Sequence, residues 1–130
     1  MLIKKRTMLV TSLLSLSLVG PVVLANDSIN TYLLQGINQP DFKLKIDENN
    51  RQVNAAIKQG LISPISELYR TVESQLHGRI VEIELDKDDN QWVYELKLYH
   101  DNKIIEAEYN AKTLELTSLS ANNLFSIIKK

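Results

Sequence analysis

The sequence contains no cysteine, only two histidines and no glycine-rich loop. The lack of cysteine excludes disulfides, so the stability of the fold must come from packing alone. The two histidines, His77 and His100, fall in different expected elements, so the ligand spacing of a zinc site is missing. We expect no metal centre and no cofactor.

The chain also lacks an excess of positive charge. It carries 15 Lys and Arg residues against 16 Asp and Glu residues. Nucleic acid binding needs a stripe of basic residues that displaces counterions from phosphates, and no such stripe is visible. We therefore expect no nucleic acid partner.

Residues 1–25 differ from the rest of the chain. Lys4, Lys5 and Arg6 precede an apolar run over residues 8–19, and small residues stand near Ala25. This order is typical of a secretory signal peptide cleaved after Ala25. The run is shorter than the roughly 20 apolar residues that span a bilayer. We expect a periplasmic or secreted protein without a stable membrane anchor after cleavage.

The mature chain, residues 26–130, has a length that suits one domain. All 16 acidic residues remain, and 12 of the 15 basic residues remain, so its net charge is −4. Residues 26–46 carry weak signals and are predicted to form a leader or extended arm, with a short alternating pattern over residues 42–46. Residues 47–120 are predicted to form the folded domain, and residues 121–130 a C-terminal tail.

Two helices are expected at the start of this domain. In residues 47–59, Asp47 can cap a helix with one apolar face, and Gly60 suits the position after its last turn. In the second helix, Ser63 can cap and Pro64 suits the first turn. Its apolar residues recur at spacings of three and four as far as Leu76, before Gly78.

After Gly78 the apolar residues alternate with charged ones, as they do in strands. The first strand is expected around residues 81–85, the second over residues 92–99, and two more near residues 104–109 and 114–116. Turns are expected over residues 86–90, at Asp101-Asn102 and over residues 110–113. Short connections force neighbouring strands to run antiparallel. The sequence therefore predicts an α+β fold with N-terminal helices packed on one face of a four-stranded antiparallel β-meander.

The two faces of this sheet are expected to differ. Trp92, Tyr94, Leu96 and Leu98 share one side of their strand and are predicted to face the core. The other side carries Glu and Lys, but four apolar residues also fall there: Ile80, Val93, Tyr99 and Ile104. Exposed apolar groups rimmed by charge often mark a partner surface. Alternatively, the apolar C-terminal residues 124–128 fold back and cover them.

Known catalytic and metal-binding patterns are absent from the sequence. Residues 86–90 resemble the start of a calcium loop, but Gln91 stands where Gly is needed and Lys97 stands where a bidentate Glu closes the shell. Ser63, Ser66 and Ser74 are not placed in any motif that activates a nucleophile. We therefore expect that the protein is not an enzyme.

Residues 60–116 resemble a PepSY domain of the small exported kind. The resemblance rests on GLISPISELYRTVESQLHGRIVEIELD, WVYELKL and KIIEAEYNAKTLEL, in this order and spacing. It implies a helix-plus-antiparallel-sheet module that occurs in propeptides of thermolysin-like peptidases and is proposed to restrain peptidases. The resemblance implies no catalytic residues.

Two functions remain open at this stage. The first is a non-catalytic binding module that modulates a peptidase or another envelope protein, with Val93, Tyr99, Ile104 and Ile80 as the candidate contact residues. The second is a small-ligand or cation sensing domain of an envelope signalling pathway, which would use the acidic strand residues and the turn at residues 86–89. Self-association as a homodimer through an open sheet edge is compatible with either.

Overall fold

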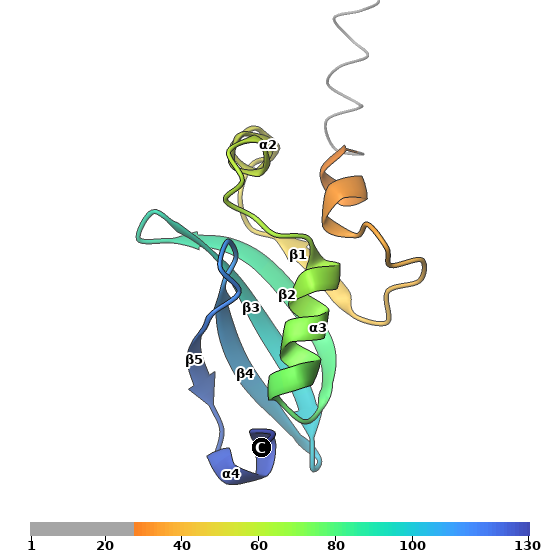
Figure 1. Ribbon diagram of the computed structural model, residues 1–130, viewed down its shortest axis with the longest axis vertical. Coiled ribbons are helices and arrows are strands. Elements are labelled where there is room, and N and C mark those ends of the chain that lie inside the picture. The colour runs from red at the N-terminus through yellow and green to blue at the C-terminus, as the bar shows by residue number, and fades with distance from the viewer. Residues whose placement is uncertain (1–27) are drawn as a thin grey trace, which may run out of the picture.

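The computed structural model describes residues 28–130. The expected signal peptide, residues 1–25, lies outside the described residues. Residues 28–33 are helical, and the later elements are β1 (Lys43–Ile46), α2 (Asn50–Lys58), α3 (Ile65–Gln75), β2 (Arg79–Asp88), β3 (Gln91–His100), β4 (Lys103–Asn110), β5 (Leu116–Ser120) and α4 (Leu124–Ile127). Figure 1 shows α3 lying across a strongly bent sheet.

The sheet has five strands in the order β1-β2-β3-β4-β5. Strands β2 to β5 form the antiparallel meander that the sequence predicts, but β5 spans Leu116–Ser120 and not residues 114–116. The prediction of four strands in a purely antiparallel sheet is wrong, because β1 pairs with β2 in parallel, with Lys43 opposite Glu82. The chain passes through α2 and α3 between β1 and β2, and a crossover of this length allows parallel pairing.

Two hairpins of the meander turn on Asp and Asn residues with positive φ. These are Asp89 (φ 47°) with Asn90 (φ 63°), and Asp101 (φ 50°) with Asn102 (φ 62°). Two consecutive left-handed residues define a type I′ turn, whose twist matches that of the flanking strands. Asp and Asn tolerate this conformation better than most residues, so the turns form without glycine.

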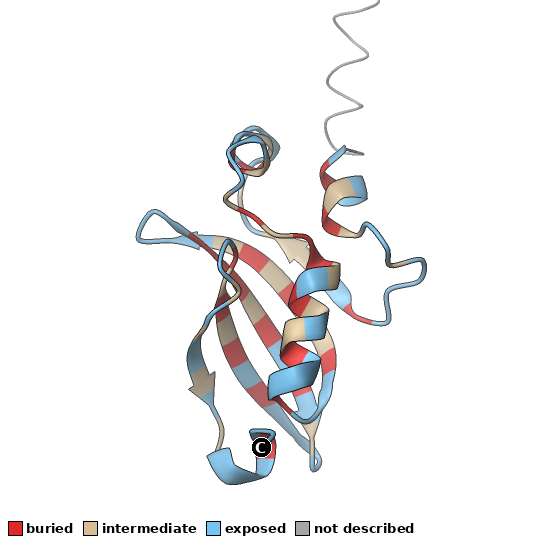
Figure 2. Cartoon of the chain, viewed as in Figure 1, coloured by how far each residue is buried: buried red, intermediate tan, exposed pale blue. Residues whose placement is uncertain are grey.

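Helix α3 covers one face of the sheet and buries its apolar stripe there. Ile65, Leu68 and Val72 of α3 are buried, and Trp92, Tyr94, Leu96 and Leu98 of β3 belong to the same core. The red bands of Figure 2 show this alternation along the strands. The predicted core face of residues 92–98 is therefore confirmed.

A β-bulge in β2 overturns the prediction for Ile80. The register shifts between Ile80 and Glu82, so that Ile80 pairs with Leu98 and Glu82 pairs with Lys97. The extra residue, Val81, breaks the alternation, because a bulge places two residues opposite one. Ile80 therefore faces the core, where it is 2% exposed.

The helix positions also differ from the predicted ones. Helix α2 is capped by Asn49, whose Oδ1 accepts from the backbone N–H of Gln52 at 2.9 Å, and not by Asp47. Pro64, not Ser63, precedes the first turn of α3, and the Ser63 hydroxyl donates to the carbonyl of Lys112 at 3.0 Å. Figure 1 shows α2 beyond the end of the sheet, so α3 is the helix that covers the sheet face.

The segment expected to form a leader packs on the domain. Ile29, Leu33 and Phe42 are buried members of the core. The Tyr32 hydroxyl donates to the carbonyl of Ile62 at 2.6 Å. Residues 28–46 thus contribute both core side chains and a strand.

The C-terminal segment closes one end of the core and leaves the outer sheet face open. Ile127 is fully buried, and its carbonyl accepts from the backbone N–H of His77 at 2.7 Å. Tyr99 and Ile104 stay 42% and 54% exposed. The alternative that the C-terminal residues cover them is therefore wrong. None of the helices in residues 28–130 is both long and apolar enough to cross a bilayer.

Candidate functional site

The candidate site is the sheet face that points away from α3, which we call the open face. Strand alternation and register place two rows of side chains on it. One row runs Glu82, Lys97, Glu106 and the other runs Glu84, Glu95, Glu108 across β2, β3 and β4. Lys45 of β1 and Ser118 and Ser120 of β5 extend the rows. The sheet therefore presents its polar side chains as a continuous surface.

The open face is hollowed. A concavity of about 310 Å³ runs over it from Lys45 to Ser118 and Ser120. Its walls contain five glutamates and two lysines, Lys45 and Lys97. Because the glutamates outnumber the lysines, the concavity carries an excess of negative charge, which raises the local concentration of cationic groups. The concavity is therefore suited to a ligand that brings positive charge.

The first row is balanced by ion pairs. Glu82 Oε1 lies 3.3 Å from Lys97 Nζ and 3.5 Å from Lys45 Nζ. The hydrogen bond from Lys97, assisted by the charge of Lys45, lowers the pKa of Glu82. These contacts link β1, β2 and β3 on the open face. The lysines are half-exposed, so we expect the pairs to add little stability.

The second row is not balanced, because Glu84 and Glu108 stand directly opposite Glu95 on its two sides. Like charges at opposed positions destabilise a sheet. Burial, the hydrogen bond with Glu84 and the charges of Asp86, Glu84 and Glu108 raise the pKa of Glu95 to about 7. Near neutral pH the Glu95 carboxyl is therefore partly protonated. A cation bound beside it would relieve the repulsion among the three glutamates.

We expect Glu95→Gln to stabilise the protein in alkaline solution. The folded pKa of Glu95, about 7, lies above the ordinary value of 4.5, so the folded state favours the protonated carboxyl. The stability that this proton gives is complete below pH 4.5 and is lost as the pH rises through 7. Gln keeps the neutral form at every pH. Thermal melts should show a higher Tm than the unmodified protein at pH 8 and an equal Tm at pH 4.5.

Glu106→Gln is the matched control for that prediction, because Glu106 stands opposite Lys97 and Ser120 instead of other acids. It should show no gain in Tm at pH 8. An equal gain for both variants would show that the crowding in the Glu95 row is not the cause.

Of the four apolar residues that the sequence suggests for partner contact, two are exposed on the open face. Tyr99 and Ile104 stand opposite each other on β3 and β4 and are 42% and 54% exposed. Val93 is 4% exposed and offers almost no surface, while Ile80 lies in the core. Ile80 is therefore removed from the candidate site, and Tyr99 and Ile104 form its apolar end.

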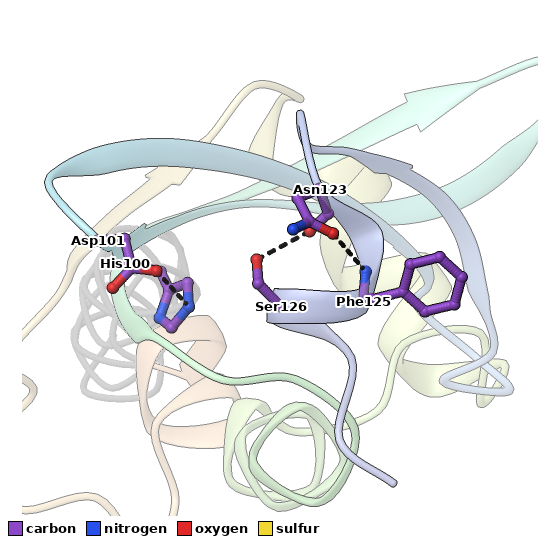
Figure 3. A network of polar contacts seen from close by, with 5 residues as sticks. All are labelled: His100, Asp101, Asn123, Phe125 and Ser126. Atoms are coloured by element: carbon purple, nitrogen blue, oxygen red, sulfur yellow. Dashed lines mark hydrogen bonds and ion pairs between the residues drawn. The ribbon is translucent and has the colours of Figure 1, made fainter.

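Beside Ile104 lies a second hollow of about 320 Å³, between the β3–β4 hairpin and the C-terminal segment. His100 Nε2 lies 3.4 Å from Asp101 Oδ2 on one side. On the other side, Asn123 Oδ1 accepts from the backbone N–H of Phe125 at 3.1 Å, and the Ser126 hydroxyl donates to the Asn123 carbonyl at 2.9 Å. Figure 3 shows the Phe125 ring pointing away from His100, and this ring is 88% exposed.

An acidic trio lies at the β1 end of the open face. Carboxylate oxygens of Asp47, Glu84 and Asp86 lie within 4.8 Å of one another. Oxygen ligands of this kind suit hard divalent cations. The sequence predicts Asp47 as a helix cap and does not indicate this cluster, because only the parallel pairing of β1 brings Asp47 beside β2. Asp86 and Asp88, expected in a turn, instead lie within β2.

Comparison with known proteins identifies the class of domain. Residues 64–118, which span α3 to β5, match the PepSY family, described as the peptidase propeptide and YPEB domain. These residues are a PepSY domain, so the resemblance found in the sequence is confirmed for this part of the chain. Searches of curated proteins and of solved structures gave no match. Strand β1, helix α2 and helix α4 lie outside the matched residues.

Proposed function

We propose that the protein is an exported, non-catalytic binding module that docks on a peptidase or another envelope protein through the open face. The observation that carries this proposal is that the sheet has one face filled by α3 and the leader, and one face left concave, charged and partly apolar. The description of the matched family as a peptidase propeptide domain supports a peptidase as the partner.

The arrangement of the open face supports docking to a protein. Tyr99 and Ile104 form an exposed apolar pair next to the charged row that contains Lys97 and Glu106. Protein interfaces combine a small apolar centre with a polar rim, and aromatic residues often carry much of the binding energy. The Tyr99 hydroxyl donates to Asn102 Oδ1 at 2.7 Å, which holds the ring over the type I′ turn.

The proposal of export rests on the signal-peptide pattern of residues 1–25. Export is also compatible with the composition, because a fold without cysteine does not depend on the redox potential. Regulation by binding requires no catalytic group. The proposed role is to hold a partner in one state by occupying its surface, as a propeptide domain does.

The proposal predicts that charge on the apolar end of the open face abolishes docking. Tyr99→Asp with Ile104→Asp should lower partner affinity at least tenfold, because two like charges are placed opposite each other in the buried part of the interface. Partners captured from an envelope extract by the unmodified protein should be identified, purified and titrated against both forms. Inhibition of the captured peptidase, or of a thermolysin-like peptidase, gives a second readout.

Arg70→Glu with Glu73→Arg is the control for this experiment. Both residues are exposed on α3, far from the open face, and the pair preserves the net charge. This variant should bind normally, and circular dichroism should confirm the fold of both variants. Unchanged affinity of a folded Tyr99→Asp, Ile104→Asp variant would remove the open face from the proposal.

Cation sensing is the second candidate, and the acidic trio of Asp47, Glu84 and Asp86 is the observation that favours it. Calorimetry with Ca²⁺, Mg²⁺ and Zn²⁺ tests it. A dissociation constant below the millimolar range that is lost in Asp47→Asn with Asp86→Asn would support it, whereas binding no tighter than millimolar would exclude it.

A further inference from the structure

The two edges of the sheet are protected to different degrees. The β1 edge is four residues long and carries Lys43 and Lys45, with Pro40 just before it. Lysine and proline at an edge prevent pairing with another strand. The β5 edge, with the sequence LTSLS, carries neither charge nor proline. Strand β1 therefore carries residues that protect a sheet edge from pairing with another strand, and β5 carries none.

The outer edge of β5 has backbone groups available for pairing. Strand β5 is last in the sheet and pairs with β4, as the left side of Figure 1 shows. Among residues 28–130, the backbone hydrogen bonds outside helices and strands do not involve Leu116–Ser120. An edge of this kind is a template for an added strand, as in β-augmentation.

The side chains next to this edge define what the added strand must carry. On the open face, Ser118 stands opposite Glu108 and Ser120 stands opposite Glu106. On the other face, Leu116 and Leu119 are half-buried and pack against the core. A register shift between Glu108 and Tyr109 adds Thr117 between Leu116 and Ser118, and the Thr117 hydroxyl donates to Glu108 Oε1 at 3.1 Å, which leaves the second carboxylate oxygen of Glu108 for a ligand. Beside Ser118, Leu119 and Ser120, the side chains of an added strand would alternate between the two surroundings.

We propose that the β5 edge binds an extended segment of the protein partner that has Lys or Arg at alternate positions and apolar residues between them. The basic residues lie over Ser118 and Ser120 and reach the carboxylates of Glu108 and Glu106. The apolar residues lie beside Leu116 and Leu119. This inference rests on the proposed docking function and names the chemistry of the segment that is recognised.

The small serine side chains make this recognition possible. Neighbouring strands lie about 4.8 Å apart, so an added strand is roughly 10 Å from β4. A hydroxymethyl group leaves room above β5 for the long side chain of Lys or Arg to pass over it. Charge complementarity to the acidic concavity then selects a cationic segment.

A second copy of the chain fits this edge less well. Pairing β5 with β5 of another copy would place Ser and Thr, not Lys or Arg, beside Glu106 and Glu108. It would also join two mature chains that each carry a net charge of −4, from 12 basic and 16 acidic residues. The partner segment is therefore the occupant that we assign, and the second copy is an outcome that the test must distinguish.

The test uses synthetic peptides of about eight residues, a usual strand length. The probe alternates Val and Lys, the first control has the same residues in two blocks, and the second alternates Val and Glu. We expect the alternating Val–Lys peptide to bind at least tenfold more tightly than either control, and its affinity to fall as salt is raised. Hydrogen exchange with the probe bound should slow at Leu116–Ser120 and not at Lys43–Ile46.

Two sets of variants test the roles of charge and edge. Glu106→Gln with Glu108→Gln should weaken binding of the Val–Lys peptide at least fivefold, while Glu67→Gln with Glu73→Gln on α3 should leave it unchanged. Ser118→Lys with Ser120→Lys places protective charge on the edge and should weaken binding at least tenfold. Circular dichroism confirms that each variant is folded.

Several results would overturn the inference. Protection at β1, equal affinity for the Val–Lys and Val–Glu peptides, or no binding of the Val–Lys peptide would each do so. Concentration-dependent protection of Leu116–Ser120 without peptide would assign the edge to a second copy. The proposed function is tested separately by Tyr99→Asp with Ile104→Asp against the whole partner. If that variant no longer docks on the partner and the Val–Lys peptide also fails to bind, the proposed docking function is supported and strand addition at β5 is excluded.

Discussion

Leu96→Asp is expected to leave the protein without a cooperative unfolding transition at neutral pH. Leu96 is 1% exposed in the middle of β3 and packs in the core between α3 and the sheet. The variant loses a leucine side chain, which costs about 2–5 kcal/mol, and places a carboxylate in an apolar environment, which costs several kcal/mol more. A domain of this size has a total stability of about 5–15 kcal/mol.

Lys97→Ser is the matched control for Leu96→Asp, one residue further along the same strand. Lys97 lies on the open face, and its ion pair with Glu82 is half-exposed, so its loss should cost less than about 1 kcal/mol. Urea titrations followed by Trp92 fluorescence should show a normal transition for Lys97→Ser and none for Leu96→Asp. A folded Leu96→Asp variant would contradict the assignment of the two faces.

Gly78→Ala is expected to lower the unfolding free energy by about 3 kcal/mol. Gly78 joins α3 to β2 with a φ of +109°, which residues with a side chain rarely adopt. A Cβ atom at this position would meet the carbonyl oxygen of Tyr99 at 3.2 Å and the Cβ atom of His100 at 3.3 Å. The contact with backbone prevents relief by a rotamer change, so the strand or the connection must shift.

Gly60→Ala separates the effect of the backbone conformation from the effect of the contact. Gly60 also has a positive φ, +74°, but nothing lies within 4 Å of a Cβ atom built there. Its substitution should cost about 1 kcal/mol, from the left-handed conformation alone. Chemical denaturation should therefore rank Gly78→Ala well below Gly60→Ala in stability. Equal losses would show that the close approach to Tyr99 is not important.

Local patterns in the sequence predicted the central part of the fold. Helix α3 and strands β2 to β4 follow from the change of period at Gly78, and Asp101-Asn102 forms the expected turn. These features depend on residues close together in the chain, where periodicity and turn chemistry are informative. The matched PepSY residues cover this part and extend into β5.

Features that depend on distant residues were not predictable in the same way. Alternation over residues 42–46 indicates a strand, but not that this strand joins the sheet beside β2 in parallel. The bulge at Val81 is not marked by glycine, so the side on which Ile80 lies could not be read from the pattern. The burial of Ile29 and Leu33 depends on how the leader returns over the core.

The candidate site was predictable in composition but not in arrangement. Alternation placed Glu82, Glu84, Glu106 and Glu108 on the side opposite the core. The direct opposition of Glu84, Glu95 and Glu108, which raises the pKa of Glu95, requires the register between strands. The open edge at β5 likewise follows only from the strand order.

Thiol labelling tests most directly the claim that one sheet face is filled and the other is open. Because the chain has no cysteine, single substitutions give an unambiguous signal. Lys97→Cys and Glu106→Cys report the open face, and Leu96→Cys and Leu98→Cys report the core face. We predict that the first pair reacts with a maleimide reagent at least about a hundredfold faster than the second, whose reaction requires opening of the structure. Slow labelling at positions 97 and 106, or fast labelling of folded protein at positions 96 and 98, would contradict the account.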